Sequence, residues 1–179
     1  QQELELRCPV LEVVQHEGWT VRAVKVNHFA PHLVSYGYRL DADGRSFVYS
    51  GDTGPCRALQ TLAQDCDVLV HMCHYLSGTA LSKTYAAFTM GHRELAELAQ
   101  DARVRNLVLS HVTTQVDRPG IRERVIREIG ETFEGITEVR AGVYFFFDLV
   151  MAGLGLCATD DIAISVLGFN LLGDGLRDL

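Results

Sequence analysis

Short apolar segments alternate with amphipathic helical segments along most of the chain. Residues 19–27, WTVRAVKVN, alternate apolar and polar positions and place Val24 and Val26 on one face, as in a half-buried strand. The segments SYGYRL and RSFVYS, joined by DADG, predict a β-hairpin. Further strands are predicted at DVLVH, RNLVLSH and EVRAGVYFFFDLV, and helices at RALQTLAQ, at GHRELAELAQDA and from Asp117–Pro119 onward. This order predicts an α/β fold with a largely buried sheet.

The last thirty residues have a different character. They are apolar and rich in glycine and show no clear period, so only a short helix or strand near Ile162–Leu172 is predicted there. We therefore expect residues 1–150 to form one domain and residues 151–179 to form a tail of undefined structure.

Three polar residues stand at or just beyond the end of a predicted strand. His28 follows VKVN, Asp52 follows FVYSG and His111 follows LVLS. Ligands gather at strand ends because a rigid sheet directs several side chains at one crevice. Imidazole and carboxylate suit zinc, and a carboxylate can bridge two ions. The pattern predicts a shared metal site, whereas the SGDTG segment considered alone is more simply a strand-to-helix turn in which Asp52 or Thr53 caps the helix Arg57–Gln64.

Other histidines leave alternatives open. The segment HMCHY supplies His71, Cys73 and His74 just past a strand; packing is the simpler interpretation and metal binding the alternative. His92 opens a helix, where an imidazole either caps the helix or transfers a proton in a site. His32 lies four residues after His28 and is an alternative ligand. We prefer His28 because it directly follows the strand that would fix it.

Taken together, these motifs resemble a known family. NHFAPHLVSYGYRL, SGDT, DVLVHMCH, GHRELAELA and LVLSH occur in the order found in the C-terminal half of metallo-β-lactamase-fold hydrolases, closest to the ribonuclease Z and arylsulfatase-like branch. The resemblance runs from about Trp19 to Leu149. It implies metallo-β-lactamase-like layers of sheet and helices over residues 1–150, incomplete at the N-terminus.

The resemblance also implies a mechanism. Two zinc ions would acidify a water molecule, with His28 and His111 each binding one ion and Asp52 bridging both. His92 would position the substrate or protonate the leaving group, so Asp52 and His92 are the catalytic candidates. The substrate would be a phosphodiester, a sulfate ester or a related ester, in a small molecule or in RNA.

Two departures from the family pattern limit these expectations. The chain contains no H-x-H-x-D-H motif, and Met72 stands where the family has an acid after the histidine matched by His71. We therefore expect a partial catalytic domain, inactive by itself, either cut from a longer protein or lacking its first half. The alternative is a non-catalytic scaffold or binding module. An H-x-H-x-D-H motif encoded upstream of Gln1 would favour the enzyme.

The composition indicates which partners and which cellular compartment are to be expected for this chain. A formal net charge of -7 disfavours nucleic-acid binding over the whole surface. Five cysteines without a C-x-x-C pair suit a reducing cytoplasm, and we expect no signal peptide and no membrane span. An incomplete sheet would leave apolar surface uncovered, so we also expect self-association, for example as a homo-oligomer.

Overall fold

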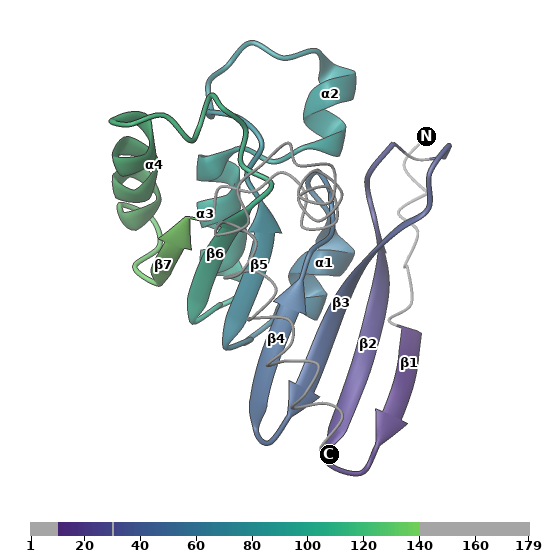
Figure 1. Ribbon diagram of the computed structural model, residues 1–179. Coiled ribbons are helices and arrows are strands. Elements are labelled where there is room, and N and C mark those ends of the chain that lie inside the picture. Colours follow the sequence, from purple (N-terminus) through teal and green to yellow (C-terminus); the bar gives the residue numbers. More distant parts are fainter. Residues whose placement is uncertain (1–10, 30, 140–179) are drawn as a thin grey trace, which may run out of the picture. The chain divides into compact units, whose positions relative to one another are not determined.

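Seven strands form one mixed sheet in the computed structural model, which describes residues 11–29 and 31–139 (Figure 1). The strands are β1 Leu11–His16, β2 Trp19–Val26, β3 Ser35–Ala42, β4 Arg45–Tyr49, β5 Val68–Met72, β6 Asn106–Ser110 and β7 Ile136–Val139. They lie side by side in chain order, antiparallel from β1 to β4 and parallel from β4 to β7. The predicted hairpin is β3–β4, whereas β1 was not predicted. The proposed domain boundary at residue 150 and the tail 151–179 lie outside the described residues.

Four helices lie within the described residues: α1 Arg57–Leu62, α2 Lys83–Phe88, α3 His92–Asp101 and α4 Ile121–Gly130. The predicted cap of α1 is wrong, because Cys56 occupies the N-cap position and no side chain caps this helix. Helix α4 begins later than predicted, at Ile121, where the Glu123 carboxylate accepts a hydrogen bond from the Gly120 N–H at 2.6 Å. None of the helices in the described part of the chain is long and apolar enough to cross a membrane.

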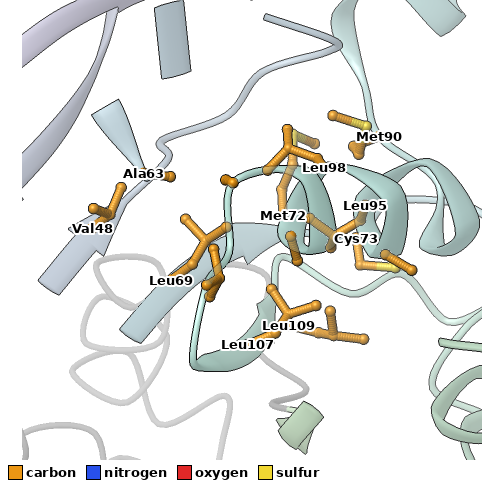
Figure 2. Close-up of a cluster of buried hydrophobic side chains, with 14 of the residues drawn as sticks. Val48, Ala63, Leu69, Met72, Cys73, Met90, Leu95, Leu98, Leu107 and Leu109 are labelled. Carbon is orange, nitrogen blue, oxygen red and sulfur yellow. The ribbon is translucent and has the colours of Figure 1, made fainter. Parts of the chain in front are cut away.

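A continuous apolar core lies between the sheet and helices α1 and α3. Val48, Leu69 and Leu107 are neighbours in register on β4, β5 and β6, and all three are fully buried. Leu59 of α1 and Leu95 of α3 belong to the same buried cluster, part of which is shown in Figure 2. Burial stabilises the fold by roughly 1.5–3 kcal/mol for each such leucine. This packing makes the sheet a rigid support for the residues at its strand ends.

Two tyrosines mark the opposite face of the sheet. Tyr38 of β3 and Tyr49 of β4 are direct cross-strand partners, and they remain 43% and 45% exposed. Alternate residues of a strand point to opposite faces, so Tyr49 lies on the face away from the buried Val48. Exposed aromatic rings on a sheet face are typical of a surface that binds another surface.

Candidate functional site

Four strands bring polar residues to the same edge of the sheet. Strand β2 is antiparallel to β3 and β3 to β4, so β2 runs in the same direction as β4, β5 and β6. The carboxyl ends of β4, β5 and β6 are at the top of Figure 1. His28 follows β2, Asp52 follows β4, His74 follows β5 and His111 follows β6. This is the edge at which open α/β sheets bind ligands.

The turn that carries Asp52 is tied to the end of β2. The Asn27 N–H donates a hydrogen bond to Thr53 Oγ1 at 3.1 Å, and the Gly54 N–H donates to Asn27 O at 2.9 Å. The Asn27 side-chain amide donates to Ala87 O at 2.8 Å. A Cβ atom on Gly54 would lie 2.1 Å from Ala87 O, so only glycine permits this close approach. Asp52 is therefore held on a turn with little freedom to move.

Asp52 and His111 form the central contact of the site. The His111 Nδ1–H donates a hydrogen bond to Asp52 Oδ1 at 2.8 Å. This bond lowers the pKa of Asp52 below its ordinary value, and the nearby imidazoles of His28 and His74 lower it further, against the effect of burial. His111 has a φ of 49°, in the left-handed region that is uncommon for residues other than glycine. Such backbone conformations are concentrated at functional sites.

His28 is oriented by a hydrogen bond to the last residue of α2. Its Nδ1–H donates to Phe88 O at 3.2 Å, which places the lone pair of the ring on Nε2. Metal-binding histidines commonly donate their other ring N–H to a backbone carbonyl in this way. His32 is exposed, and of the two histidines only His28 contributes to the lowered pKa of Asp52. The geometry thus favours His28 over His32 as the residue near Asp52.

His74 joins this cluster, although the sequence pattern assigned it a packing role first. Its ring lies edge-on to His111, with ring centroids 4.9 Å apart. Among the described residues, the His74 Nδ1 atom is buried and has no hydrogen-bond partner. The Thr113 hydroxyl donates to His74 O at 2.8 Å and fixes the backbone beside the ring. The signal in the sequence was its position just past a strand end, which it shares with Asp52 and His111.

His71 and Cys73, the other two candidate ligands in HMCHY, are buried in the core. His71 is fully buried and its Nδ1–H donates to Met72 O at 2.8 Å. Burial lowers the pKa of His71 to about 4, so this imidazole is neutral at pH 7. Burial raises the pKa of the Cys73 thiol to about 12, so this thiol carries a proton at pH 7. Burial in the core fits the packing interpretation for both residues, but among the described residues His71 Nε2 has no hydrogen-bond partner.

His92 links helix α3 to helix α4. The residue is buried, its Nδ1 accepts a hydrogen bond from the Ser77 N–H at 3.1 Å and its Nε2–H donates to Glu128 Oε2 at 2.8 Å. Glu128 also accepts hydrogen bonds from Arg93 and Arg124. Both ring nitrogens are thus used: Nε2 joins α3 to α4, and Nδ1 joins α3 to the segment between β5 and α2. The catalytic role expected for His92 stays a prediction.

Replacing Glu128 with glutamine should lower the thermal midpoint by several degrees near neutral pH, and the loss should become smaller as the pH falls below about 4.5. Hydrogen bonds from Arg124, His92 and Arg93 hold the pKa of Glu128 far below its ordinary value of 4.5. A carboxylate with a depressed pKa stabilises the fold above its unfolded pKa, and this contribution is lost as the pH falls through its folded pKa.

The measurement is thermal unfolding of the parent chain and of Glu128→Gln by circular dichroism, from about pH 7 to about pH 3. The difference in midpoint should be full above about pH 4.5 and shrink below it. Glu131→Gln, an exposed glutamate just past the same helix, is the matched control and should behave as the parent chain. A difference that stays constant into acid would contradict the ion-pair assignment.

The donor atoms at the strand ends suit zinc in kind. Two imidazoles and one carboxylate, from His28, His111 and Asp52, are typical zinc ligands. Within residues 11–29 and 31–139, however, no three histidine, cysteine, aspartate or glutamate side chains come close enough together to hold an ion. Asp52 and His111 are thus in contact, and His28 and His74 lie near enough to affect the pKa of Asp52; the metal site expected from the sequence stays a prediction.

Comparison with known protein families identifies the family to which the chain belongs. A family described as "Beta-lactamase superfamily domain" matches residues 7–112. The chain belongs to the β-lactamase superfamily. The match includes His28, Asp52 and His111.

The curated relatives place this superfamily chain near ribonuclease Z. It is 30% identical to ribonuclease Z of Mycobacterium bovis over 69% of the chain and 45% of that relative. The chain thus spans less than half the length of this relative. A further match, 68% identical to D-threo-3-hydroxyaspartate dehydratase of Delftia sp., covers 19% of the chain and 9% of that protein. The latter match is too short to carry an argument.

Solved structures confirm the expected fold. The metallo-β-lactamase fold protein YhfI from Bacillus subtilis has a TM-score of 0.59 at 18% identity, over 73% of this chain and 50% of that chain. Zn²⁺-bound PqqB from Methylobacterium extorquens has a TM-score of 0.51 at 14% identity, over 75% of this chain and 52% of that chain. At these identities the likeness concerns the fold alone.

Proposed function

We infer that this β-lactamase-superfamily chain carries part of the site of a zinc-dependent hydrolase, with His28, Asp52 and His111 as ligands. The observation that carries this proposal is the hydrogen bond from His111 to Asp52, made at a strand edge where His28 and His74 also lower the pKa of that carboxyl group. A carboxylate that accepts a hydrogen bond from one imidazole and has its pKa lowered by two more contributes little to packing. It is an arrangement suited to holding a cation.

Each proposed ligand has a definite part in the site. Asp52 is ionised at neutral pH, as any aspartate with a pKa at or below the ordinary value of 3.8 is, so its charge is available to a cation. His111 and His28 each donate Nδ1–H to an oxygen of the chain, and this fixes which ring nitrogen carries the lone pair. When bound, zinc supplies Lewis-acid polarisation and acidifies water. His92 would act on a substrate only after giving up one of its two hydrogen bonds.

Separate observations support the choice of metal, the substrate, the location and the self-association of the chain. The solved PqqB structure contains Zn²⁺, and the similarity to ribonuclease Z favours a phosphodiester in RNA among the ester substrates. Sulfate esters and related esters remain within the same chemistry. The cysteine composition supports a cytoplasmic location. The exposed pair Tyr38 and Tyr49 supports self-association.

A non-catalytic scaffold is the second candidate function. It is favoured by the lack of a three-ligand group in the described part of the chain and by Met72 in place of an acid. A scaffold, however, gains nothing from a carboxylate fixed on a glycine-rich turn against a strained histidine. Zinc binding at that carboxylate separates the two candidates.

The test is a titration of ¹⁵N-labelled residues 1–179 with Zn²⁺, followed by nuclear magnetic resonance. We expect the signals of His28, Asp52 and His111 to shift or broaden first. His16, which ends β1 at the opposite edge of the sheet, is the internal control and should not respond at the same zinc concentration. Mg²⁺, which prefers oxygen ligands in octahedral geometry, should have no effect. Shifts confined to other histidines, or none at all, would favour the scaffold.

A further inference from the structure

A cavity of about 550 Å³ lies at the edge of the sheet opposite the candidate site. Its walls come from the β1–β2 turn, the β3–β4 turn and the segments that lead into β5 and β6, at the lower end of the sheet in Figure 1. The parallel strands begin here, whereas Asp52 and His111 follow their other ends. The volume falls within the range of small-molecule sites, roughly 300–1,000 Å³.

One row of cross-strand partners lines this cavity from β1 to β4. His16 of β1 pairs with Trp19 of β2. Trp19 in turn pairs with Ala42 of β3, and Ala42 pairs with Arg45 of β4. Neighbouring strands lie about 4.8 Å apart, so the backbones of Trp19 and Arg45 are about 10 Å apart. The cavity therefore presents aromatic rings and a guanidinium group within the reach of one small ligand.

The aromatic part of the cavity is a stacked pair of rings. The imidazole of His16 and the indole of Trp19 have centroids 5.5 Å apart and planes only 13° from parallel. His16 is exposed and Trp19 is half-buried, and both rings line the cavity. Nucleobases and other flat rings stack on aromatic side chains in this near-parallel geometry. A flat ring can thus extend the stack.

The basic part is an arginine pair, Arg45 and Arg105, that shares one carboxylate oxygen. Arg105 Nη1–H donates to Asp67 Oδ1 at 2.7 Å, and Arg45 Nη1 lies 3.9 Å from the same oxygen. Asp67 Oδ2 accepts instead from the Ser46 N–H at 2.7 Å. The two arginine side chains are 82% and 70% exposed. One carboxylate thus faces two guanidinium groups, which keep N–H donors for a further anion.

The other carboxylates of the lining do not cancel this positive charge. Asp41 accepts hydrogen bonds from Arg22 and Arg39. Asp65 accepts two hydrogen bonds from Arg103, both at 2.7 Å. The remaining aspartate of the lining is exposed in the β3–β4 turn, where water and salt screen its charge. The arginine pair is therefore the place in the cavity where an anion is attracted.

We propose that this cavity binds a mononucleotide, with its base stacked on the rings of Trp19 and His16 and its phosphate held by Arg45 and Arg105. A nucleotide joins a flat ring and a phosphate in one compact molecule, so it uses both parts of the cavity at once. The cavity lies apart from Asp52 and His111, so the nucleotide is a ligand rather than a substrate. The inference holds whether or not the chain hydrolyses an ester.

The single tryptophan of the chain gives a direct measurement, because Trp19 lines the cavity. Adenosine 5′-monophosphate, added to residues 1–179 in the presence of a chelator, should quench the fluorescence of Trp19 and reach saturation. ¹⁵N spectra should show shifts at Trp19 and at the arginine pair, and none at Asp52 or His111. In the same spectra, the nucleotide should bind at least about tenfold more tightly than adenosine, which lacks the phosphate, or ribose 5-phosphate, which lacks the base.

Variants connect the binding to the arginine pair. Arg45→Gln and Arg105→Gln should each weaken nucleotide binding about tenfold and leave the weak binding of adenosine unchanged, because they remove a phosphate contact. Both side chains are exposed, so the variants should stay folded, which thermal unfolding checks. Arg118→Gln is the matched control: this arginine is exposed in the segment before α4 and does not line the cavity. It should bind the nucleotide as the parent chain does.

Several results would overturn the inference. Equal affinity for the nucleotide and adenosine would mean that the arginine pair does not hold the phosphate. Equal affinity for the nucleotide and ribose 5-phosphate would mean a plain phosphate site. Shifts at Asp52 and His111 in place of the cavity would put the nucleotide at the candidate site. Tighter binding of single-stranded hexa-adenylate would assign the cavity to an RNA strand. An equal loss in Arg118→Gln would show nonspecific attraction of anions.

Discussion

Replacing Asp52 with asparagine should lower the affinity of the chain for zinc by at least about 100-fold. Asparagine has nearly the same size and keeps one oxygen that can accept the hydrogen bond from His111, but it removes the negative charge. The imidazoles of His28, His74 and His111 all lower the pKa of Asp52, so the negative charge of this carboxylate interacts with all three rings. A cation placed among imidazoles alone would lose its main electrostatic partner.

Competition with a chromogenic chelator measures this affinity. Asp43→Asn is the matched control, because Asp43 is exposed in the β3–β4 turn with a φ of 50°, a conformation that asparagine adopts well. It should bind zinc as the parent chain does. Equal zinc affinity in Asp52→Asn and the parent chain would remove Asp52 from the metal site and favour the scaffold.

Residues 1–179 by themselves should hold zinc weakly and hydrolyse no ester above the uncatalysed rate. A catalytic zinc usually takes three protein ligands and keeps one position open. With His28, Asp52 and His111 shared between two ions, each ion would receive one histidine and a share of one carboxylate. Metal affinity depends on a complete, preformed set of ligands, so an incomplete set binds weakly.

Zinc content after dialysis, together with hydrolysis of bis(4-nitrophenyl) phosphate and 4-nitrophenyl sulfate, tests this expectation. Asp52→Asn serves as the blank for the assay. Tightly held zinc with turnover would mean that ligands have been misassigned, most directly by underrating His32, His71, Cys73 or His74. The alanine variants of these four residues, measured in the same way, would then identify the missing ligand.

Much of the fold follows from local patterns in the sequence. Val24 and Val26 alternate with polar residues and are buried in β2, and the turn DADG joins β3 to β4. Strand direction then explains the site, because parallel strands that alternate with helices deliver their following residues to one edge. His28, Asp52 and His111 reach that edge for this reason.

Other features depend on contacts that no local pattern reveals. Helix α2 buries no residue, so it has no apolar stripe to predict it. The contact between the rings of His74 and His111 joins the segment after β5 to the segment after β6. His92 finds its partner Glu128 thirty-six positions away, on another helix. Pairings of this kind are set by helix packing and need the folded structure.

The order of the strands has a consequence for how the chain is made. Each strand of the sheet pairs with its predecessor in the chain, from β1 through β7. Among the described strands, each one that emerges during synthesis therefore finds its partner already made, and none of them is inserted between two earlier ones. The β1–β4 meander needs only short loops to close, whereas each parallel strand after β4 must wait for a helical connection. The sheet can accordingly grow from its first strands outward, with the strand ends that carry Asp52 and His111 completed late.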